Sequence, residues 1–144
     1  DRHHQSPTEF QLIDNSEQST ATVTWDATDD RAKGAWANTE DATRDGAYAI
    51  ALASTELSRK LVAVSRAETK TGADYYIAPA EDNGDMESWI RLEVSGTDLD
   101  EAQVGYRVNQ KVKQAKEGNS NLPALAAVVG FKASVISLRS VEVE

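Results

Sequence analysis

Two acidic side chains, Asp74 and Glu93, are the residues of this chain best suited by type and position to act together. Asp74 opens an apolar run that reads Tyr-Tyr-Ile-Ala, and Glu93 lies near the end of the next apolar run. If the two runs form a hairpin, both carboxylates approach the same end of a sheet. Carboxylate oxygens gathered in this way are ligands for hard divalent cations. The pair therefore predicts a metal site.

A basic cluster follows the two acids along the chain. Its cations share one side of a helix expected over residues 101–117, with no acid among them until Glu117: Arg107, Lys111, Lys113 and Lys116. The chain has a net charge of −9, which argues against coating nucleic acid by bulk electrostatics. Any nucleic-acid contact would therefore use this confined patch. The alternative is a solvated helix face favoured by the negative end of the helix dipole.

Other chemistry is excluded by composition. The chain has no cysteine, which removes disulfides and thiolate sites and leaves the redox compartment open. Its two histidines, His3 and His4, lie in a polar N-terminal stretch, so histidine triads and histidine metal clusters are not expected in the folded body. Ser95 has neither a histidine partner nor a Gly-x-Ser-x-Gly elbow, which argues against a serine nucleophile.

The elements that must position these residues follow from periodicity and capping. The length of 144 residues predicts one domain. Residues 1–19 are expected to be a polar N-terminal tail or edge segment, and residues 26–33 a loop. A helix is expected from Asn38 or Thr39 to Arg59, with its apolar stripe at Gly46, Ala49, Ile50, Ala53 and Leu57. Strands are expected over residues 20–25, 61–68, 74–78, 88–95, 123–131 and 134–143.

The expected strands combine into one α/β domain over residues 20–144. In the strand at 88–95, Ile90, Leu92 and Val94 share one face, and Arg91, Glu93 and Ser95 share the other. The run at 123–131 is almost wholly apolar, which is typical of a strand covered on both faces. A crossover through the second helix would make this strand parallel to an earlier one. The prediction is a mixed sheet of five or six strands with two main helices.

This element order, together with two short motifs, resembles the PD-(D/E)xK nuclease superfamily, which has the restriction-endonuclease-like fold. The likeness covers about residues 38–131. The sequence Gly-Ala-Asp at 72–74 is similar to the aspartate motif at the start of the second core strand. The sequence Glu-Val-Ser at 93–95 is similar to the Glu-x-Lys motif, with Ser95 where the family has lysine.

The resemblance implies a set of site residues. Asp74, Glu93 and the backbone carbonyl of Val94 would bind Mg²⁺ or Mn²⁺, with Glu40 as a further ligand from the first helix and Glu56 as the runner-up. Lys111 or Lys113 would take the part of the missing motif lysine. Nucleic acid would be contacted by the basic side of the second helix, through Arg107, Lys111, Lys113 and Lys116.

Plainer roles remain open for the same residues. Asp74 follows a glycine and an alanine, so its carboxylate would serve equally as a turn residue that caps backbone amides. Glu93 would equally form a surface ion pair with Arg91. Because Ser95 replaces the motif lysine, the alternative function is a catalytically inactive copy of the scaffold that binds a protein partner or completes an assembly. Whether the chain is an enzyme therefore stays open at this stage.

The location of the protein is only weakly indicated. No run of 18 or more apolar residues occurs, and the first residues have neither the basic nor the apolar region of a signal peptide. We therefore expect a soluble protein without a membrane partner, in the cytoplasm. The absence of an initiator methionine leaves a processed N-terminus open.

Overall fold

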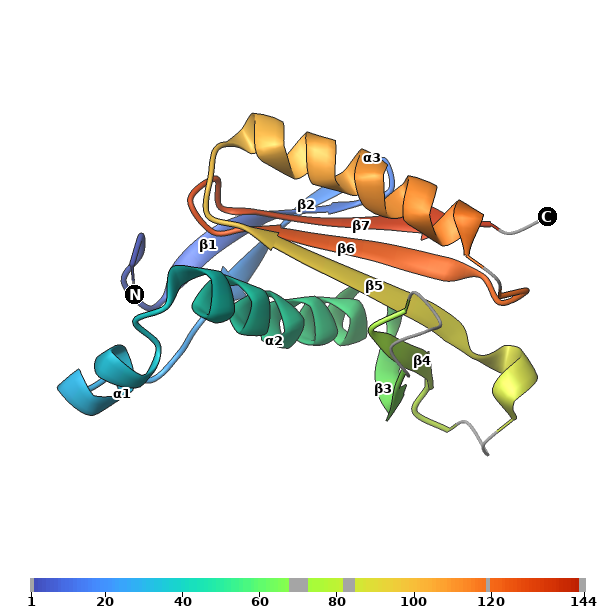
Figure 1. The fold of residues 1–144 in the computed structure, drawn as a ribbon, viewed down its shortest axis with the longest axis horizontal. Helices are drawn as coiled ribbons and strands as arrows, with labels where there is room; N and C mark the ends of the chain where they lie inside the picture. Colours follow the sequence, from blue (N-terminus) through green and yellow to red (C-terminus); the bar gives the residue numbers. More distant parts are fainter. Residues whose placement is uncertain (1, 68–72, 82–84, 119, 143–144) are drawn as a thin grey trace.

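A mixed β-sheet forms the centre of the molecule (Figure 1). The computed structural model describes residues 2–67, 73–81, 85–118 and 120–142. The elements within these ranges are, in chain order, β1 (Thr8–Asp14), β2 (Glu17–Val23), α1 (Asp30–Ala35), α2 (Thr39–Arg59), β3 (Leu61–Arg66), β4 (Tyr75–Pro79), the 3₁₀ turn η2 (Met86–Ser88), β5 (Ile90–Thr97), α3 (Glu101–Glu117), β6 (Ala124–Gly130) and β7 (Val135–Val141).

The strands of the described residues form one seven-stranded sheet in the order β2-β1-β7-β6-β5-β4-β3. The meander of β3, β4 and β5 is antiparallel. Through α3 the chain then crosses to β6, which is parallel to β5, as the apolar run at 123–131 predicts. The class of a single α/β domain with a mixed sheet is confirmed, whereas the expected five or six strands are too few.

The additional strand comes from the N-terminal segment. Residues 8–19, expected within a tail or edge segment, form β1 and the beginning of β2 at one edge of the sheet. Phe10 and Leu12 alternate with polar residues and are buried, because β1 pairs in parallel with β7. The strand expected at 20–25 begins earlier, at Glu17, and the expected loop at 26–33 contains the first four of the six residues of α1.

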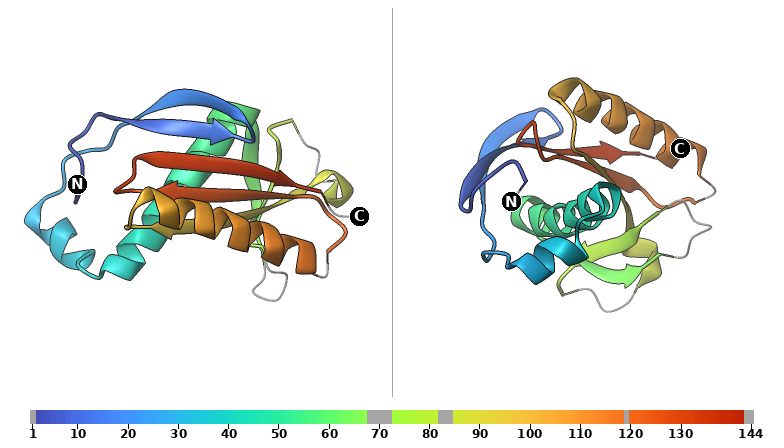
Figure 2. Two further views of the ribbon diagram at one scale, coloured as in Figure 1. Left: turned by 90° about the horizontal axis from the view of Figure 1, so that it is seen from above. Right: turned by 60° about the vertical axis from the view of Figure 1, so that its left-hand side comes forward.

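The two long helices cover opposite faces of the sheet (Figure 2). Ala47 and Ala51 of α2 pack with Leu92, Leu125 and Ala127 in the larger core cluster. On the other face, Val104 and Val108 of α3 pack with Val128 and Val135. Every residue of β6 is buried, which confirms that this strand is covered on both sides.

The bounds of α2 are as predicted, but its buried stripe is not. The Asn38 side chain caps the helix by accepting a hydrogen bond from the Asp41 amide at 3.0 Å. The buried positions are Ala47, Ala51, Ser54 and Thr55, whereas Ala49, Ala53 and Leu57 are exposed. The Thr55 hydroxyl donates to the Ala51 carbonyl at 2.7 Å, so this polar side chain is satisfied within its own helix and can be buried.

Close packing fixes α2 against β5 at Gly96. A Cβ atom at Gly96 would lie 2.7 Å from the Ala47 Cβ and 2.8 Å from the Thr43 carbonyl oxygen. Only a glycine leaves room for the helix backbone to approach the strand this closely. The helix therefore holds a fixed position over β5, which also determines where its polar side chains lie.

An ion pair ties the C-terminal end of α2 to the end of β1. Arg59 donates from Nε to Asp14 at 3.2 Å, and the Ser58 hydroxyl donates to the same carboxylate at 2.6 Å. Burial acts to raise the pKa of Asp14, but the hydrogen bonds from Arg59 and Ser58 and the Arg59 charge outweigh it and lower the pKa. The N-terminal hairpin is thus joined to the body by charge as well as by strand pairing.

Some predictions lie outside the described residues. Gly72 of the aspartate motif, the turn expected at 69–72 and the Asn-Gly turn at 83–84 belong to this group. Within the ranges that the structure describes, none of the helices has the length and apolar character needed to cross a membrane.

Candidate functional site

Asp74 lies immediately before β4 and bridges two other elements. Its amide donates to the Leu92 carbonyl of β5 at 2.9 Å, which fixes its position beside that strand. Its Oδ2 accepts from the Val94 amide at 2.7 Å, and its Oδ1 accepts from the Tyr48 hydroxyl of α2 at 3.1 Å. The carboxylate thus caps a backbone amide, as the turn interpretation predicts, and is held in a single orientation.

Glu93 is buried on the face of β5 that turns toward α3. The residue is 1% exposed, and no protein group within the described ranges donates a hydrogen bond to either of its carboxylate oxygens. Its nearest basic group is the Arg91 guanidinium, with Nη1 at 4.0 Å from Oε1. The expectation of a surface ion pair is therefore wrong, because both side chains are buried.

Charges from three elements act on Glu93. Burial raises the pKa of its carboxyl group; the positive charges of Lys111 and Arg91 oppose this shift, and the negative charge of Asp74 adds to it. The net effect is a raised pKa. The charges of Asp74, immediately before β4, and of Lys111, on α3, therefore both influence the Glu93 carboxyl group.

Backbone geometry adds a third oxygen to the site. The N–H and C=O of one strand residue point to the same side of the strand. Since the Val94 amide points to Asp74, the Val94 carbonyl points to the same edge of β5. Asp74 and Val94 are thus joined by a hydrogen bond, whereas Glu93, on the α3 face of β5, interacts with Asp74 through charge.

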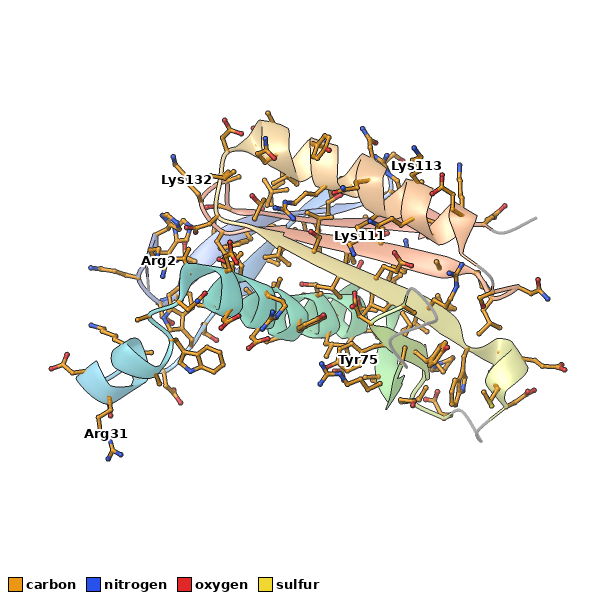
Figure 3. All side chains as sticks on the ribbon, in the orientation of Figure 1. Arg2, Arg31, Tyr75, Lys111, Lys113 and Lys132 are labelled. Carbon is orange, nitrogen blue, oxygen red and sulfur yellow. The ribbon has the colours of Figure 1, made fainter. Side chains whose placement is uncertain are left out.

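The four cations of α3 divide into two pairs. Arg107 and Lys111 are partly buried, and the Arg107 guanidinium donates to the Ser95 hydroxyl at 3.1 Å. Lys113 is exposed and forms a 4.0 Å ion pair with Glu117, and Lys116 is also exposed. Figure 3 shows Lys111 on the side of α3 that turns toward the sheet and Lys113 on the outer side. Of the two lysine candidates, Lys111 is the one whose charge acts on Glu93.

The expected acids of α2 lie away from this site. Glu40 is exposed in the first turn, eight residues before Tyr48, which corresponds to about 12 Å along the helix axis. Glu56 is exposed eight residues after Tyr48, about the same distance in the other direction. Asp74 therefore contacts Val94, and the charges of Asp74 and Lys111 act on Glu93, whereas Glu40 and Glu56 lie about two helical turns from Tyr48 on either side.

Two residues near the site differ from what the sequence indicated: Tyr48 was not expected there, and Arg91 was expected only as a surface ion-pair partner of Glu93. Tyr48 binds Asp74 and packs edge-on against Tyr75 at 5.7 Å between ring centroids. Burial, the Asp74 charge and the hydrogen bond to Asp74 together raise the pKa of Tyr48, which keeps its hydroxyl a donor. Arg91 is completely buried and donates to the carbonyls of Leu122 and Ala115. One tyrosine among the small residues of α2 was the available signal for Tyr48.

The donor set suits a hard divalent cation. No group of three or more histidine, cysteine, aspartate or glutamate side chains is arranged around a common ion position in the described part of the chain. Two carboxylates and a backbone carbonyl nevertheless fit Mg²⁺ or Mn²⁺, because such ions take few protein oxygens and retain several waters. The two buried Glu93 oxygens without a hydrogen-bond donor are the observation that favours this fit.

Known proteins give no further guide to this site. Comparison of the chain with protein-family models, with curated proteins and with solved structures finds no match.

Proposed function

We propose that the chain is a nuclease-like domain in which Asp74 and Glu93 bind Mg²⁺ or Mn²⁺ for hydrolysis of a phosphodiester in nucleic acid. The carrying observation is the buried Glu93 carboxylate, which has no hydrogen-bond donor among the described residues and lies in the field of Asp74 and Lys111. A carboxylate in this state is costly to the fold, so a ligand that coordinates it would offset the cost.

The protein groups at the site would have different roles in metal binding. Asp74, Glu93 and the Val94 carbonyl would be the protein ligands. A carboxylate has about four acceptor positions, so the bonds from Val94 and Tyr48 orient Asp74 and still leave capacity for a cation. The buried guanidinium of Arg91 compensates part of the negative charge of Glu93.

The reaction would be attack of water on phosphorus, with cleavage of the bond to the leaving ester oxygen and transfer of a proton to that oxygen. The bound cation would lower the pKa of the attacking water and neutralise charge on the phosphoryl oxygens. Lys111 would supply the ammonium group that Ser95 cannot. Arg107, held by Ser95 at 3.1 Å, adds positive charge on the same side of α3 for the phosphate backbone.

The architecture supports the same proposal. From α2 to β6 the order is helix, three antiparallel strands, helix and a strand parallel to the third. This is the element order that underlies the resemblance to the restriction-endonuclease-like core. The aspartate immediately precedes the second of these strands, and the glutamate is in the middle of the third.

A second function, an inactive copy of this scaffold that binds a protein or completes an assembly, is favoured by a different observation. The Ser95 hydroxyl, at the position of the motif lysine, is bonded to Arg107 and partly buried. Glu93 is only 1% exposed, which limits the access of a substrate phosphate to it. Metal binding without cleavage is the result that this alternative predicts.

Calorimetric titration of MgCl₂ and MnCl₂ tests the metal site directly. We expect saturable binding to the unmodified protein and its loss in Asp74→Asn and in Glu93→Gln. Glu40→Gln is the matched control, since Glu40 is an exposed acid about 12 Å along α2 from Tyr48. Absence of binding to the unmodified protein, or unchanged binding to Asp74→Asn, would exclude the metal site.

Cleavage assays with single-stranded, duplex and branched DNA and with RNA then separate the two functions. Lys111→Ala should reduce cleavage by about 10²-fold or more, the effect of removing one group that stabilises transition-state charge. Lys113→Ala should remain within about threefold of the unmodified protein, because Lys113 is paired with Glu117 at the surface. Metal binding with no cleavage of any of these substrates would support the inactive scaffold instead.

A further inference from the structure

A cavity lies at the end of the molecule formed by the N-terminal segment, α1 and the first half of α2. Its volume is about 640 Å³, within the range of pockets that hold small ligands. Figure 1 shows α1 and the N-terminus together at this end, with β3 and β4 at the other end of α2. The cavity is therefore separate from the site at Asp74 and Glu93, and nothing in the proposed hydrolysis uses it.

Four large aromatic side chains contribute to its walls. Phe10 of β1 and Phe131 after β6 form the inner side, and Trp25 and Trp36 come from the segments on either side of α1. Trp36 is 52% exposed, and α1 has no buried residue. The helix thus stands over an apolar space without filling it, and a ligand with an apolar body would cover this surface.

The charged residues at the cavity are mainly basic. Acids outnumber lysine and arginine by 24 to 15 in the whole chain, but the cavity is lined by Arg2, Lys33, His3 and His4 against one acid, Asp98. Asp98 is already paired with His3 at 2.5 Å and with Arg2 at 3.5 Å. For Lys33 the described part of the chain provides no ion-pair partner, so the lining residues carry one net positive charge when the histidines are neutral.

We propose that this cavity binds a small amphiphilic anion: an alkyl or aryl body of roughly ten carbons that carries one carboxylate. The apolar body lies between Phe10, Phe131 and the two tryptophans, and the carboxylate faces Lys33 and Arg2 at the opening. A neutral ligand would have no electrostatic attraction to the local positive charge, and a cationic ligand would be repelled by it.

Titration with sodium decanoate, followed by calorimetry and by tryptophan fluorescence, tests the proposal. Two of the three tryptophans line the cavity, so the emission should change as it fills. Decanol and decyltrimethylammonium serve as neutral and cationic ligands of equal chain length. We expect saturable decanoate binding that is at least about tenfold tighter than binding of either comparison ligand.

Three variants locate the site. Ala49→Phe, on an exposed position of α2 that lines the cavity, should abolish binding by filling the space. Lys33→Glu should weaken decanoate binding by about tenfold or more. Lys116→Glu makes the same charge change on an exposed lysine of α3 and should leave the affinity unchanged. Circular dichroism melting curves establish that each variant is folded.

The outcomes separate cleanly. No saturable binding of decanoate, or equal affinity for decanol, overturns the proposal of an anion site. Binding that survives Ala49→Phe, or that falls equally in Lys33→Glu and Lys116→Glu, shows that the ligand does not occupy this cavity and also overturns it. Because the experiment contains no divalent metal and no nucleic acid, its result is independent of the proposed nuclease activity.

Discussion

The two faces of β5 are buried to a similar degree but consist of opposite chemistry. Leu92 and Val94 face α2 in an apolar cluster with Ala47 and Ala51. Arg91 and Glu93, on the alternate face, are 0% and 1% exposed. Burial of a leucine side chain stabilises a fold by about 1.5–3 kcal/mol, whereas burial of a charge costs free energy unless it is well paired.

The difference shows that one face of the strand contributes to stability, whereas the other face carries a candidate functional residue. The apolar face can be explained completely by packing. The charged face cannot, because Arg91 has two backbone acceptors while Glu93 has no hydrogen-bond donor in the described residues. A buried group that the fold does not satisfy is the feature that distinguishes a candidate site from a core position.

The largest effect should come from removing the cation of the charged face. Arg91→Met leaves Glu93 buried without its neighbouring positive charge, and we expect it to lower the free energy of unfolding by about 3–5 kcal/mol. Arg139→Met, on an exposed position of β7, is the control and should change it by less than about 0.5 kcal/mol. Urea denaturation measures both. Equal effects of the two substitutions would mean that the buried Arg91–Glu93 pair makes no special contribution to the free energy of unfolding.

On the apolar face, a single methyl group should disturb the packing. Gly96→Ala places a Cβ 2.7 Å from that of Ala47, and we expect a loss of about 1–3 kcal/mol in the free energy of unfolding. Gly105→Ala is the matched control, because a Cβ there meets no atom within 4 Å and the position is inside α3. The free energy of unfolding of this control should increase by up to about 1 kcal/mol. A stable Gly96→Ala variant would contradict the close approach of α2 to β5.

The smallest change in the free energy of unfolding is expected for Glu93→Gln. It should be a gain, whereas Arg91→Met and Gly96→Ala should each cause a loss. Because the folded-state pKa of Glu93 is raised, the folded protein holds this proton more tightly than the unfolded chain does. The resulting stabilisation is present at low pH and is lost as pH rises through the folded pKa. The glutamine variant has no such loss, so its stability relative to the unmodified protein should increase between about pH 4 and pH 8, by about 1 kcal/mol or less.

Melting temperatures of the two proteins across this pH range measure the effect. A difference that stays constant with pH, or one that moves in favour of the unmodified protein, would show that Glu93 is not held in a strained ionised state. The measurement needs no metal, so it examines the charged face separately from the metal-binding experiment.

Local signals predicted much of the fold. Asn38 and Asp100 cap the two long helices at the expected places, and the apolar run of β6 indicated its burial. The buried stripe of α2 was not predictable in this way, because Thr55 satisfies its hydroxyl within the helix and is buried despite being polar. The N-terminal strand was missed because its position depends on pairing with β7, a contact between distant parts of the sequence.

The site shows the same division between local and distant information. Asp74 and Glu93 could be named from motif and alternation alone. The choice between Lys111 and Lys113 could not, because two residues turn about 200° around a helix and the sequence does not say which side faces β5. Tyr48 reaches Asp74 from 26 positions away in the chain, and only the packing of α2 brings the two together.

The parallel pairing of β1 with β7 has a consequence for biosynthesis. Gln11 pairs with Val135, so β1 leaves the ribosome more than a hundred residues before the strand that it pairs with in parallel. Until β7 emerges, the nascent hairpin of β1 and β2 has no sheet to join, and Phe10 and Leu12 remain uncovered. Exposed apolar strands of this kind are substrates for chaperones and for self-association. The nascent chain should therefore depend on protection until β7 has emerged.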